Sequence, residues 1–579
     1  MASYSRRTFL GGAAAVAAGL SLADSPYASA AAYDRALATT AARAVRVAGT
    51  TLEQVATPAG TGPYVRLGAG PGWPLVVRTE LAAGAAGRDD RRTGLASFVQ
   101  FTDLHLADTE SPVRFEYLAP FIDSAHRPHE TLTVRGASSL VDRVNALAGG
   151  PYTGQPFSLV MATGDNTDNH ELVELDWYLS VMSGGTITPS TGDTGRYEGV
   201  QNSGSSNYWN PESSFQDDYK TKGFPQVPGF LSAAGRPFTA TGLRAPWYTT
   251  VGNHDDSIEG TLPDLGLLGS LYTGGNKIEG LDSATAAKLA DAIQHDPAAA
   301  VTLLATLLAT GPVRKVTPDA RRAPFTPKQF AAAHLNSAYT GSGPYGHGFT
   351  QSAADSGKLY YTFPVAPGVL GVSLDTTNRA GWADGSIGTT QLKWLESVLQ
   401  ATSTHWYDSD GNVVRRGSQD QYVLVFSHHT STTMGNTLPD PYNLFEARHS
   451  GAELVSLLQR YPNVLAWVNG HTHANQITPH AHAVAERSFW EINTASHVDF
   501  PQHARVIEVA DNGDGTLSLF TTLIESAAPY ATDFGDTSER GLAALYRELS
   551  YNDPYATPAD KIGAAGDHNT ELLLARPGA

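Results

Sequence analysis

The sequence predicts an α/β fold in which several strands end at one shared polar site. Five apolar runs have the length and composition of buried strands, and a short polar block follows each of them. The runs are residues 97–102, 157–162, 247–251, 422–426 and 464–468. In α/β sheets, ligands bind beyond the carboxyl ends of the strands. Five polar blocks at five strand ends therefore indicate a single binding site.

The first thirty residues, 1–30, match a twin-arginine export signal. Arg6 and Arg7 precede the uncharged segment 9–22, and Ala28-Ser29-Ala30 offers a small-residue cleavage site. A cytoplasmic amphipathic leader is the alternative, but the three parts have the order and spacing of a signal. The uncharged segment is shorter than the roughly 20 apolar residues that cross a membrane. We therefore expect translocation by the twin-arginine machinery, an extracellular or cell-envelope location, and no transmembrane segment in the mature protein.

The composition excludes several classes of site. The chain has 579 residues, a formal net charge of −18 and no cysteine. Without cysteine there are no thiolate zinc sites, disulfides or thiol nucleophiles. Binding to duplex nucleic acid needs clustered Lys and Arg, and no basic run follows the N-terminus. We therefore expect no nucleic-acid duplex as a partner.

The remaining chain divides around the polar blocks. Residues 31–94 read as a β-rich N-terminal extension, because two strand-like runs flank a Gly/Pro-rich turn. The main domain is expected over 95–530, followed by a helical C-terminal tail over 531–579. Two insertions, about 182–245 and 256–356, are longer than ordinary loops and interrupt the series of blocks. We expect them to form a cap or rim over the site, with a helix over the apolar run at 298–311.

The five blocks offer Asp, Asn and His side chains, which suit divalent first-row metals. They are Asp103-Leu104-His105, Gly164-Asp165-Asn166, Gly252-Asn253-His254-Asp255, Ser427-His428-His429 and Gly470-His471-Thr472-His473. A lone histidine is more often structural than a ligand, and the chain has 19, so the argument rests on the combined pattern. The segment 511–515 resembles the start of a calcium loop, but Gly513 occupies a ligand position. We expect a hairpin turn there.

In order and spacing, the blocks resemble the calcineurin-like metallophosphoesterase superfamily, and the leader and insertions resemble its exported bacterial members. The resemblance implies a four-layer α/β/β/α sandwich, with metals at the strand ends, and two divalent ions of Mn, Fe, Zn or Co. It implies a first metal held by Asp103, His105, Asp165 and His473. It implies a second metal held by the bridging Asp165, with Asn253, His428 and His471. The choice of His428 over the neighbouring His429 follows the motif position and stays open at this point.

The resemblance also implies the catalytic groups. A metal-bound hydroxide would attack phosphorus, and a shared carboxylate would hold the two metals about 3.5–4 Å apart. His254 follows Asn253 directly, so we expect it beside the second metal, where it can donate a proton to the ester. We name Asp255 as its catalytic partner, and Asp168 as the alternative that could orient its ring.

The substrate is the least determined part of the prediction. Purple acid phosphatases in this superfamily have Gly in place of His105 and a metal-binding Tyr in place of Asp168, so a tyrosinate–iron site is not expected. The Asp103-Leu104-His105 opening favours phosphodiesters. The alternatives are a phosphomonoesterase or nucleotidase, and a non-catalytic exported binding protein on the same fold. Aromatic residues of the first insertion, Tyr208, Trp209 and Phe215, either stack on a base or anchor the loop by packing.

Overall fold

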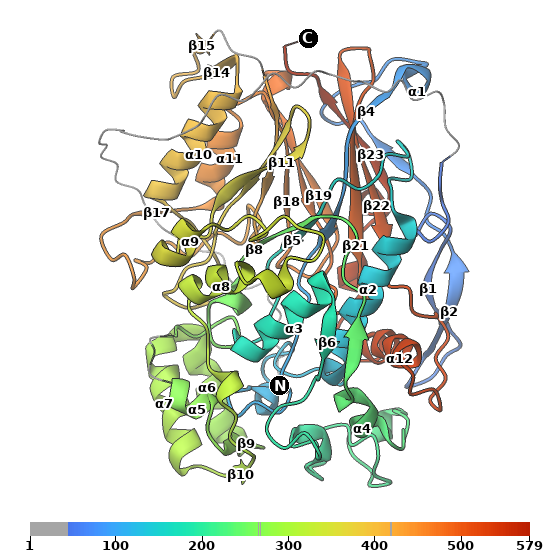
Figure 1. The fold of residues 1–579 in the computed structure, drawn as a ribbon, viewed down its shortest axis with the longest axis vertical. Helices are drawn as coiled ribbons and strands as arrows, with labels where there is room; N and C mark the ends of the chain where they lie inside the picture. The colour runs from blue at the N-terminus through green and yellow to red at the C-terminus, as the bar shows by residue number, and fades with distance from the viewer. Residues whose placement is uncertain (1–44, 265, 267, 417–419, 579) are drawn as a thin grey trace.

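Two β-sheets lie face to face at the centre of the protein, and helices cover the outer face of each (Figure 1). The computed structural model describes residues 45–264, 266, 268–416 and 420–578. The sequence predicted an α/β fold, and the architecture is the α/β/β/α sandwich that the family resemblance implied. The export signal expected at 1–30 lies outside the described residues.

The larger sheet has seven strands, and three of them lead into polar blocks. In spatial order the strands are β3 (Val76–Arg78), β23 (Thr570–Ala575), β22 (Thr516–Ile524), β21 (Ala504–Asp511), β4 (Thr93–Phe101), β5 (Val160–Thr163) and β8 (Trp247–Thr250). The last three are parallel, with Val99 opposite Val160 and Val160 opposite Trp247. The first three polar blocks therefore leave the sheet at the same edge. The predicted turn at 511–515 is the hairpin between β21 and β22.

The smaller sheet has six strands and supplies the other two blocks. In spatial order its strands are β11 (Tyr361–Ala366), β12 (Val369–Ser373), β16 (Tyr422–Phe426), β18 (Val464–Asn469), β20 (Phe489–Asn493) and β19 (Gln476–His480). The four from β12 to β20 are parallel. All five predicted strands are thus present, and each precedes its polar block.

Apolar side chains fill the three spaces between the four layers. Between the sheets lie residues such as Phe98, Leu424 and Trp490. Helices α2 (Thr133–Leu147) and α3 (Leu172–Ser183) pack on the seven-stranded sheet. Helices α10 (Thr389–Thr402) and α11 (Gly451–Leu458) pack on the other sheet. One polar link crosses between the sheets near the ligand blocks, where the buried Gln100 amide donates to the carbonyl of Asn469 at 2.8 Å.

Much of the two insertions lies at the lower end of the molecule in Figure 1, whereas α8 (Pro327–His334) and α9 (Gln351–Ser356) of the second insertion lie near mid-height. The first contains β6 (Gly185–Ile187), α4 (Phe230–Gly235) and β7 (Phe238–Ala240). The second contains α5 (Gly269–Tyr272), β9 (Asn276–Ile278), α6 (Ser283–His295), α7 (Pro297–Thr310), β10 (Val313–Lys315), α8 and α9. The Asp296 carboxylate caps α7 by accepting from Ala299 N at 3.1 Å. Tyr208 and Trp209 are buried, so they are packing anchors, whereas Phe215 is 44% exposed.

Segments near both ends of the described chain contribute strands to the seven-stranded sheet. This finding corrects the predicted bounds of the main domain. The C-terminal segment 531–579 contains α12 (Glu539–Tyr551) and α13 (Pro558–Ile562), but also strand β23. β23 lies between β22 and β3, and β3 comes from the N-terminal extension. The expected helical tail is therefore wrong for its last part. The short leucine run in β23 has no periodicity that would distinguish a strand from a helix.

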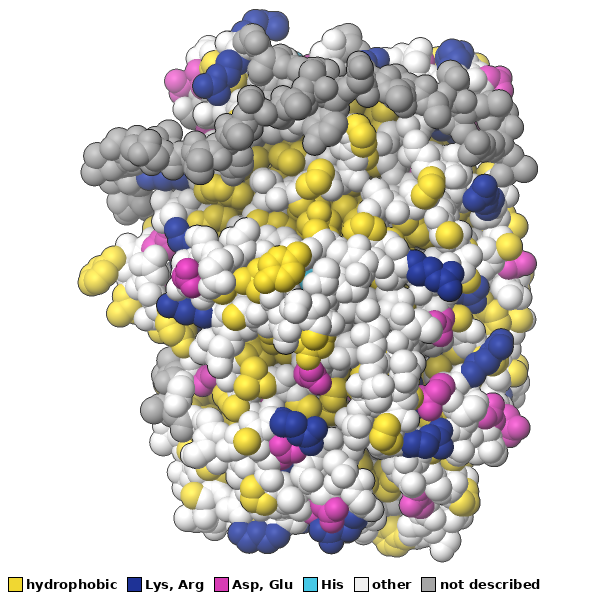
Figure 2. All heavy atoms as spheres, viewed as in Figure 1, with side chains coloured by type: hydrophobic (Ala, Val, Ile, Leu, Met, Phe, Trp, Pro, Cys, Tyr) yellow, Lys and Arg dark blue, Asp and Glu magenta, His cyan; other side chains and the backbone are white. Residues whose placement is uncertain are grey.

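The remaining elements are short. They are β1 (Gln54–Ala59) paired with β2 (Arg66–Pro71), α1 (Arg88–Arg91), β13 (Ile387–Gly388) paired with β17 (Arg448–His449), and β14 (His405–Tyr407) paired with β15 (Val413–Arg415). Among the described residues, no helix is long and apolar enough to cross a membrane. On the face shown in Figure 2, Lys and Arg side chains are scattered, and histidine is nearly invisible.

Shortening a side chain of β23 tests whether the C-terminal strand belongs to the core. Leu572 is fully buried between the two sheets, so Leu572→Ala leaves a cavity. We expect a loss of roughly 2–5 kcal/mol in the free energy of unfolding, measured by denaturant titration. Leu444→Ala, at a residue that is 61% exposed, is the control and should be nearly neutral. Equal effects of the two substitutions would contradict the placement of β23.

Candidate metal centre

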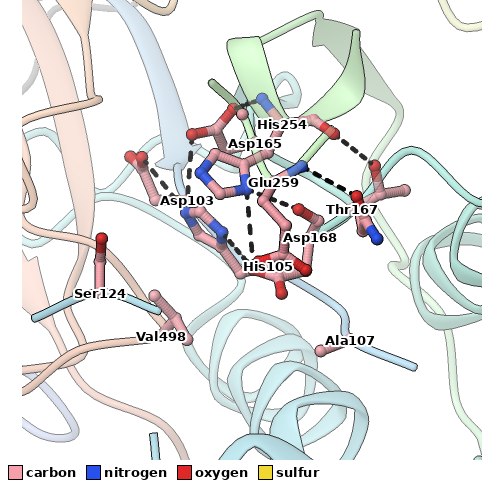
Figure 3. A network of polar contacts seen from close by, with 12 residues as sticks. Asp103, His105, Ala107, Ser124, Asp165, Thr167, Asp168, His254, Glu259 and Val498 are labelled. Atoms are coloured by element: carbon pink, nitrogen blue, oxygen red, sulfur yellow. Dashed lines mark hydrogen bonds and ion pairs between the residues drawn. The ribbon is translucent and has the colours of Figure 1, made fainter. Parts of the chain in front are cut away.

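The first group of candidate ligands is Asp103, His105, Asp165 and His473. Their side chains are buried, and one potential ligand atom from each lies within 4.8 Å of the others. His473 Nε2 is 3.2 Å from Asp103 Oδ1, and His105 Nε2 is 3.6 Å from Asp165 Oδ2. In Figure 3, Asp103, His105, Asp165 and His254 point toward one another. The sequence-predicted ligands of the first metal thus converge on one point.

Two carboxylates set which ring nitrogen of these histidines faces the centre. His105 Nδ1 donates to Asp168 Oδ1 at 2.9 Å, and His473 Nδ1 donates to Asp499 Oδ2 at 2.6 Å. Each Nε2 therefore carries a lone pair, yet the two Nε2 atoms are only 3.2 Å apart. Two facing lone pairs need a cation between them, either a proton or a metal ion. This donor set fits a divalent metal.

The second group consists of Asn253, His428 and His471, beside Asp165. His471 Nδ1 lies 3.1 Å from Asn253 Oδ1 and 3.2 Å from His428 Nε2. The Asn253 amide donates to the carbonyl of Gly260 at 2.9 Å, which turns its oxygen toward His471. His428 Nδ1 donates to the carbonyl of Thr163 at 2.9 Å. His471 Nδ1, Asn253 Oδ1 and His428 Nε2 thus face one another, and all three atoms could bind a cation once the two ring nitrogens carry no proton.

The geometry separates His428 from His429. His429 Nε2 donates to the carbonyl of Ala383 at 2.9 Å, and its Nδ1 is 2.8 Å from the Thr376 hydroxyl. Both ring nitrogens of His429 are therefore engaged with the protein. His428 Nε2 instead lies 3.1 Å from Asp165 Oδ2. Of the two alternatives, His428 is the one that faces the centre.

Five of the candidate ligands have a backbone conformation that L-residues rarely adopt. Their φ angles lie between 44° and 71°, in the left-handed region. They are Asp103, His105, Asp165, His471 and His473. Such a conformation costs on the order of 1–2 kcal/mol per residue and persists only where the surroundings enforce it. Here His105 N donates to the carbonyl of Asp165 at 2.9 Å, which links two of these positions directly.

His254 lies beside the two groups of candidate ligands, and a hydrogen bond from Nδ1 fixes its ring. Its Nδ1 donates to the backbone carbonyl of Asp168 at 2.6 Å, and its backbone N–H donates to Asp165 Oδ1 at 2.8 Å. Gly260, at φ 64°, packs so closely that a Cβ there would lie 2.4 Å from His254 Nε2. Glycine at this position leaves room for the ring. His254 is partly exposed, with 18% of its side chain accessible.

The prediction that Asp255 acts on His254 is wrong. The Asp255 carboxylate instead accepts backbone N–H groups from Gly252, Asn166 and Thr167 at 2.9–3.2 Å. It therefore fastens the second block to the third. Of the two partners that the sequence left open, Asp168 is the one that contacts the His254 ring. Sequence proximity suggested Asp255, but the turn at Asn253–Asp255 directs its side chain toward the neighbouring block.

The carboxylates of the centre stabilise positive charge on the neighbouring histidines, as the pKa values of these groups indicate. Although burial opposes ionisation, the histidines around Asp103 hold its pKa well below the usual range. Burial alone would lower the pKa of His105, but Asp103 and Asp168 raise it to about 10. Likewise, burial is outweighed by Asp165, which raises the pKa of His428 to about 9. In the metal-free protein, protons therefore occupy part of the centre at neutral pH.

Sequence reasoning missed the groups that lie behind the first ligand group. Asp499 follows β20 but stands in no recognisable block, although the strand-end rule applies to β20 as well. Arg114 binds Asp168 at 2.6 Å, and Arg127 binds Asp499 at 2.6 Å. Both arginines are nearly inaccessible to solvent. No local sequence signal marks a buried arginine.

No protein-family model and no curated protein matches this sequence. Among solved structures, the chain is similar to a dimetal phosphatase from Danio rerio, with 11% identity and a TM-score of 0.34, over 75% of this chain and 99% of that one. It is also similar to a purple acid phosphatase from yellow lupin (Lupinus luteus) seeds, with 11% identity and a TM-score of 0.26, over 82% of this chain and 55% of that one. Because both scores are below 0.5, the assignment of the centre rests on its own geometry.

Metal binding should release protons at neutral pH. Because the pKa values of His105 and His428 are raised to about 10 and about 9, an incoming metal must displace their protons. We expect roughly two protons per molecule at pH 7, and an apparent affinity that increases as the pH rises toward 9–10. Calorimetric titration of the metal-free protein with Mn²⁺ in buffers of different ionisation enthalpy measures this release.

The control is His254→Gln. Burial lowers the pKa of His254 to about 4, so this ring is already neutral at pH 7 and its loss should not change the proton count. A binding heat that is independent of the buffer would contradict the prediction.

Proposed function

We propose that this protein is a phosphoester hydrolase that uses two divalent metals and acts on a small phosphoester. The observation that carries the proposal is the position of Asp165. Its Oδ2 lies 3.1 Å from His428 Nε2 and 3.6 Å from His105 Nε2, between the two ligand groups. If two metals were bound, this one carboxylate could serve both, and a metal pair would supply the chemistry of in-line displacement at phosphorus.

Asp103, His105, Asp165 and His473 would hold the first metal, and Asp165, Asn253, His428 and His471 the second. Such a pair supplies an activated water and neutralises charge on the phosphoryl group. The donors are nitrogen and oxygen atoms, which suit Mn, Fe, Zn or Co without selecting one of them.

In our proposal, His254 delivers the proton that the leaving group requires. With Nδ1–H engaged by Asp168, its Nε2 is the atom that can carry that proton. Burial lowers the pKa of this ring to about 4, which favours the neutral form in the unliganded protein. The negative oxygens of a bound phosphoester act in the opposite direction and favour protonation. In this proposal, substrate binding supplies the negative charge that protonation of His254 needs.

The opening Asp103-Leu104-His105 supports phosphodiesters as the substrate class, and a phosphomonoesterase or nucleotidase is the alternative. The leader at 1–30 supports export by the twin-arginine route, so that the enzyme would act on phosphoesters of the envelope or the medium. A non-catalytic binding protein is the rival from another class. The presence of a proton donor beside two complete ligand groups argues against it.

Substituting the bridge and the proton donor should separate metal binding from catalysis. We expect Asp165→Ala to lower the metal content of both sites and to abolish activity, because both groups lose a ligand. His254→Ala should keep both metals and lower kcat by roughly 10²–10⁴. Elemental analysis and hydrolysis of bis-p-nitrophenyl phosphate measure the two effects. A metal-depleted His254→Ala variant would show that the role of His254 is wrongly assigned.

The ratio of kcat/KM for bis-p-nitrophenyl phosphate and p-nitrophenyl phosphate tests the substrate class. We expect the Mn²⁺-loaded enzyme to prefer the diester. A ratio well below one would overturn this preference in favour of a phosphatase or nucleotidase. Absence of metal-dependent hydrolysis of either ester, of nucleotides and of glycerophosphodiesters would favour the binding protein.

A further inference from the structure

We infer that Lys561, on the C-terminal helix α13, is a positioning residue of the first metal site. It acts through Asp499, together with Arg127, and so sets the orientation of the ligand His473. The inference rests on the proposed two-metal function, because it concerns how one of those metals is held.

The contact between Asp499 and His473 is short and almost fully enclosed. His473 Nδ1 donates to Asp499 Oδ2 at 2.6 Å, with 3% and 6% of the two side chains accessible. The carboxylate fixes the proton on Nδ1 and leaves the Nε2 lone pair to face the centre. Groups in this position orient metal ligands, and their loss typically weakens metal binding or activity 10–100-fold.

Two cations fix the carboxylate in turn. Arg127 donates to both oxygens, through Nε to Asp499 Oδ1 at 2.6 Å and through Nη2 to Oδ2 at 3.5 Å, and Lys561 Nζ donates to Asp499 Oδ2. Oδ2 therefore receives both Lys561 and His473, while Oδ1 is turned toward Arg127. With one partner on each side, the carboxylate cannot rotate about its Cβ–Cγ bond without breaking a charged hydrogen bond.

The backbone around Lys561 is fastened to the segment that carries His473. Asn475 N donates to the carbonyl of Lys561 at 3.0 Å, and the Asn475 amide donates to the carbonyl of Ile562 at 3.1 Å. Lys561 therefore arrives at Asp499 on an element that is registered against the fifth ligand block. A surface ion pair formed by chance would lack this backbone registration.

The arrangement belongs to the first metal site and not to the second. The other histidine of the first group, His105, is held by Asp168, which binds the buried Arg114. In the second group, His428 Nδ1 donates to a backbone carbonyl. Weakening the Asp499 support should therefore affect the first metal selectively. A general loss of folding would affect both.

Lys561→Met is the informative variant, because 20% of the Lys561 side chain is accessible and Arg127 still pairs with Asp499. Titration of the metal-free full-length protein with Mn²⁺ gives the affinity of each site, and His105→Ala identifies the step that belongs to the first. We expect Lys561→Met to weaken the first site by roughly 10-fold, at the low end of the range for such groups. The second site should keep its affinity within a few-fold.

Two further variants distinguish positioning from a general effect of charge. Lys561→Arg retains a cation that can reach Asp499 and should restore most of the affinity. Lys288→Met makes the same chemical change at an exposed position of α6 and should change neither site. Asp499→Asn removes the acceptor charge itself, so we expect it to weaken the first site at least as much as Lys561→Met.

Three outcomes would overturn the inference. One is unchanged affinity of the first site in Lys561→Met, whatever the effect of Asp499→Asn. Another is an equal loss at both sites, which indicates a structural role. The third is a raised KM with unchanged metal affinity, which would make Lys561 a substrate-binding residue. A wild-type protein that binds no divalent metal would instead refute the proposed function itself, so the two failures are distinguishable.

Discussion

The position of Asp165 between the two groups of candidate ligands is the constraint on which the rest of the structure depends. One carboxylate can reach two ligand groups only if strand ends from both sheets meet around it. β5 delivers Asp165 between β4 and β8, which carry the blocks of Asp103 and Asn253. β16 and β18 of the other sheet bring His428 and His471 from the opposite side. The contact between Gln100 and Asn469 holds the two sheets together close to that meeting point.

Bringing these groups together buries several charges, which is costly unless each charge finds a partner. Salt bridges between buried side chains, which extend outward from the centre, offset this cost. Asp168 and Asp499 each support a histidine and are each bound by a buried arginine. Removing one partner of such a pair leaves an uncompensated buried charge, which typically destabilises a protein by about 3–5 kcal/mol. These charged side chains are therefore as necessary to the candidate metal centre as the candidate ligands themselves.

The backbone of the polar blocks is strained, and this strain is linked to the direction in which the chain leaves each strand. Positive φ angles at Asp103, His105 and Asp165 turn the chain sharply at the point where each strand ends. The polar side chains therefore lie beyond the strand ends, where candidate ligand atoms of Asp103, His105 and Asp165 come within 4.8 Å of one another. Hydrogen bonds between neighbouring blocks, such as that from Asp103 N to the carbonyl of Gly164, hold the turns in place. A rigid centre of this kind can keep its ligands in position before any metal arrives.

The sequence by itself determined the five strands, the order of the polar blocks and the side chains that the folded chain brings together as candidate ligands. These features are local, because an apolar run followed directly by polar residues encodes both the strand and what stands at its end. The tertiary structure alone showed that His428 faces Asp165 whereas both ring nitrogens of His429 contact other groups, since the two neighbours differ only in which partners surround their rings. It also replaced Asp255 by Asp168 as the partner of His254, and it placed β23 in the central sheet. The pairing of Arg127 with Asp499 joins residues 372 positions apart. Such pairings depend on which side chains the folded chain brings together, and no local periodicity or composition records that distance.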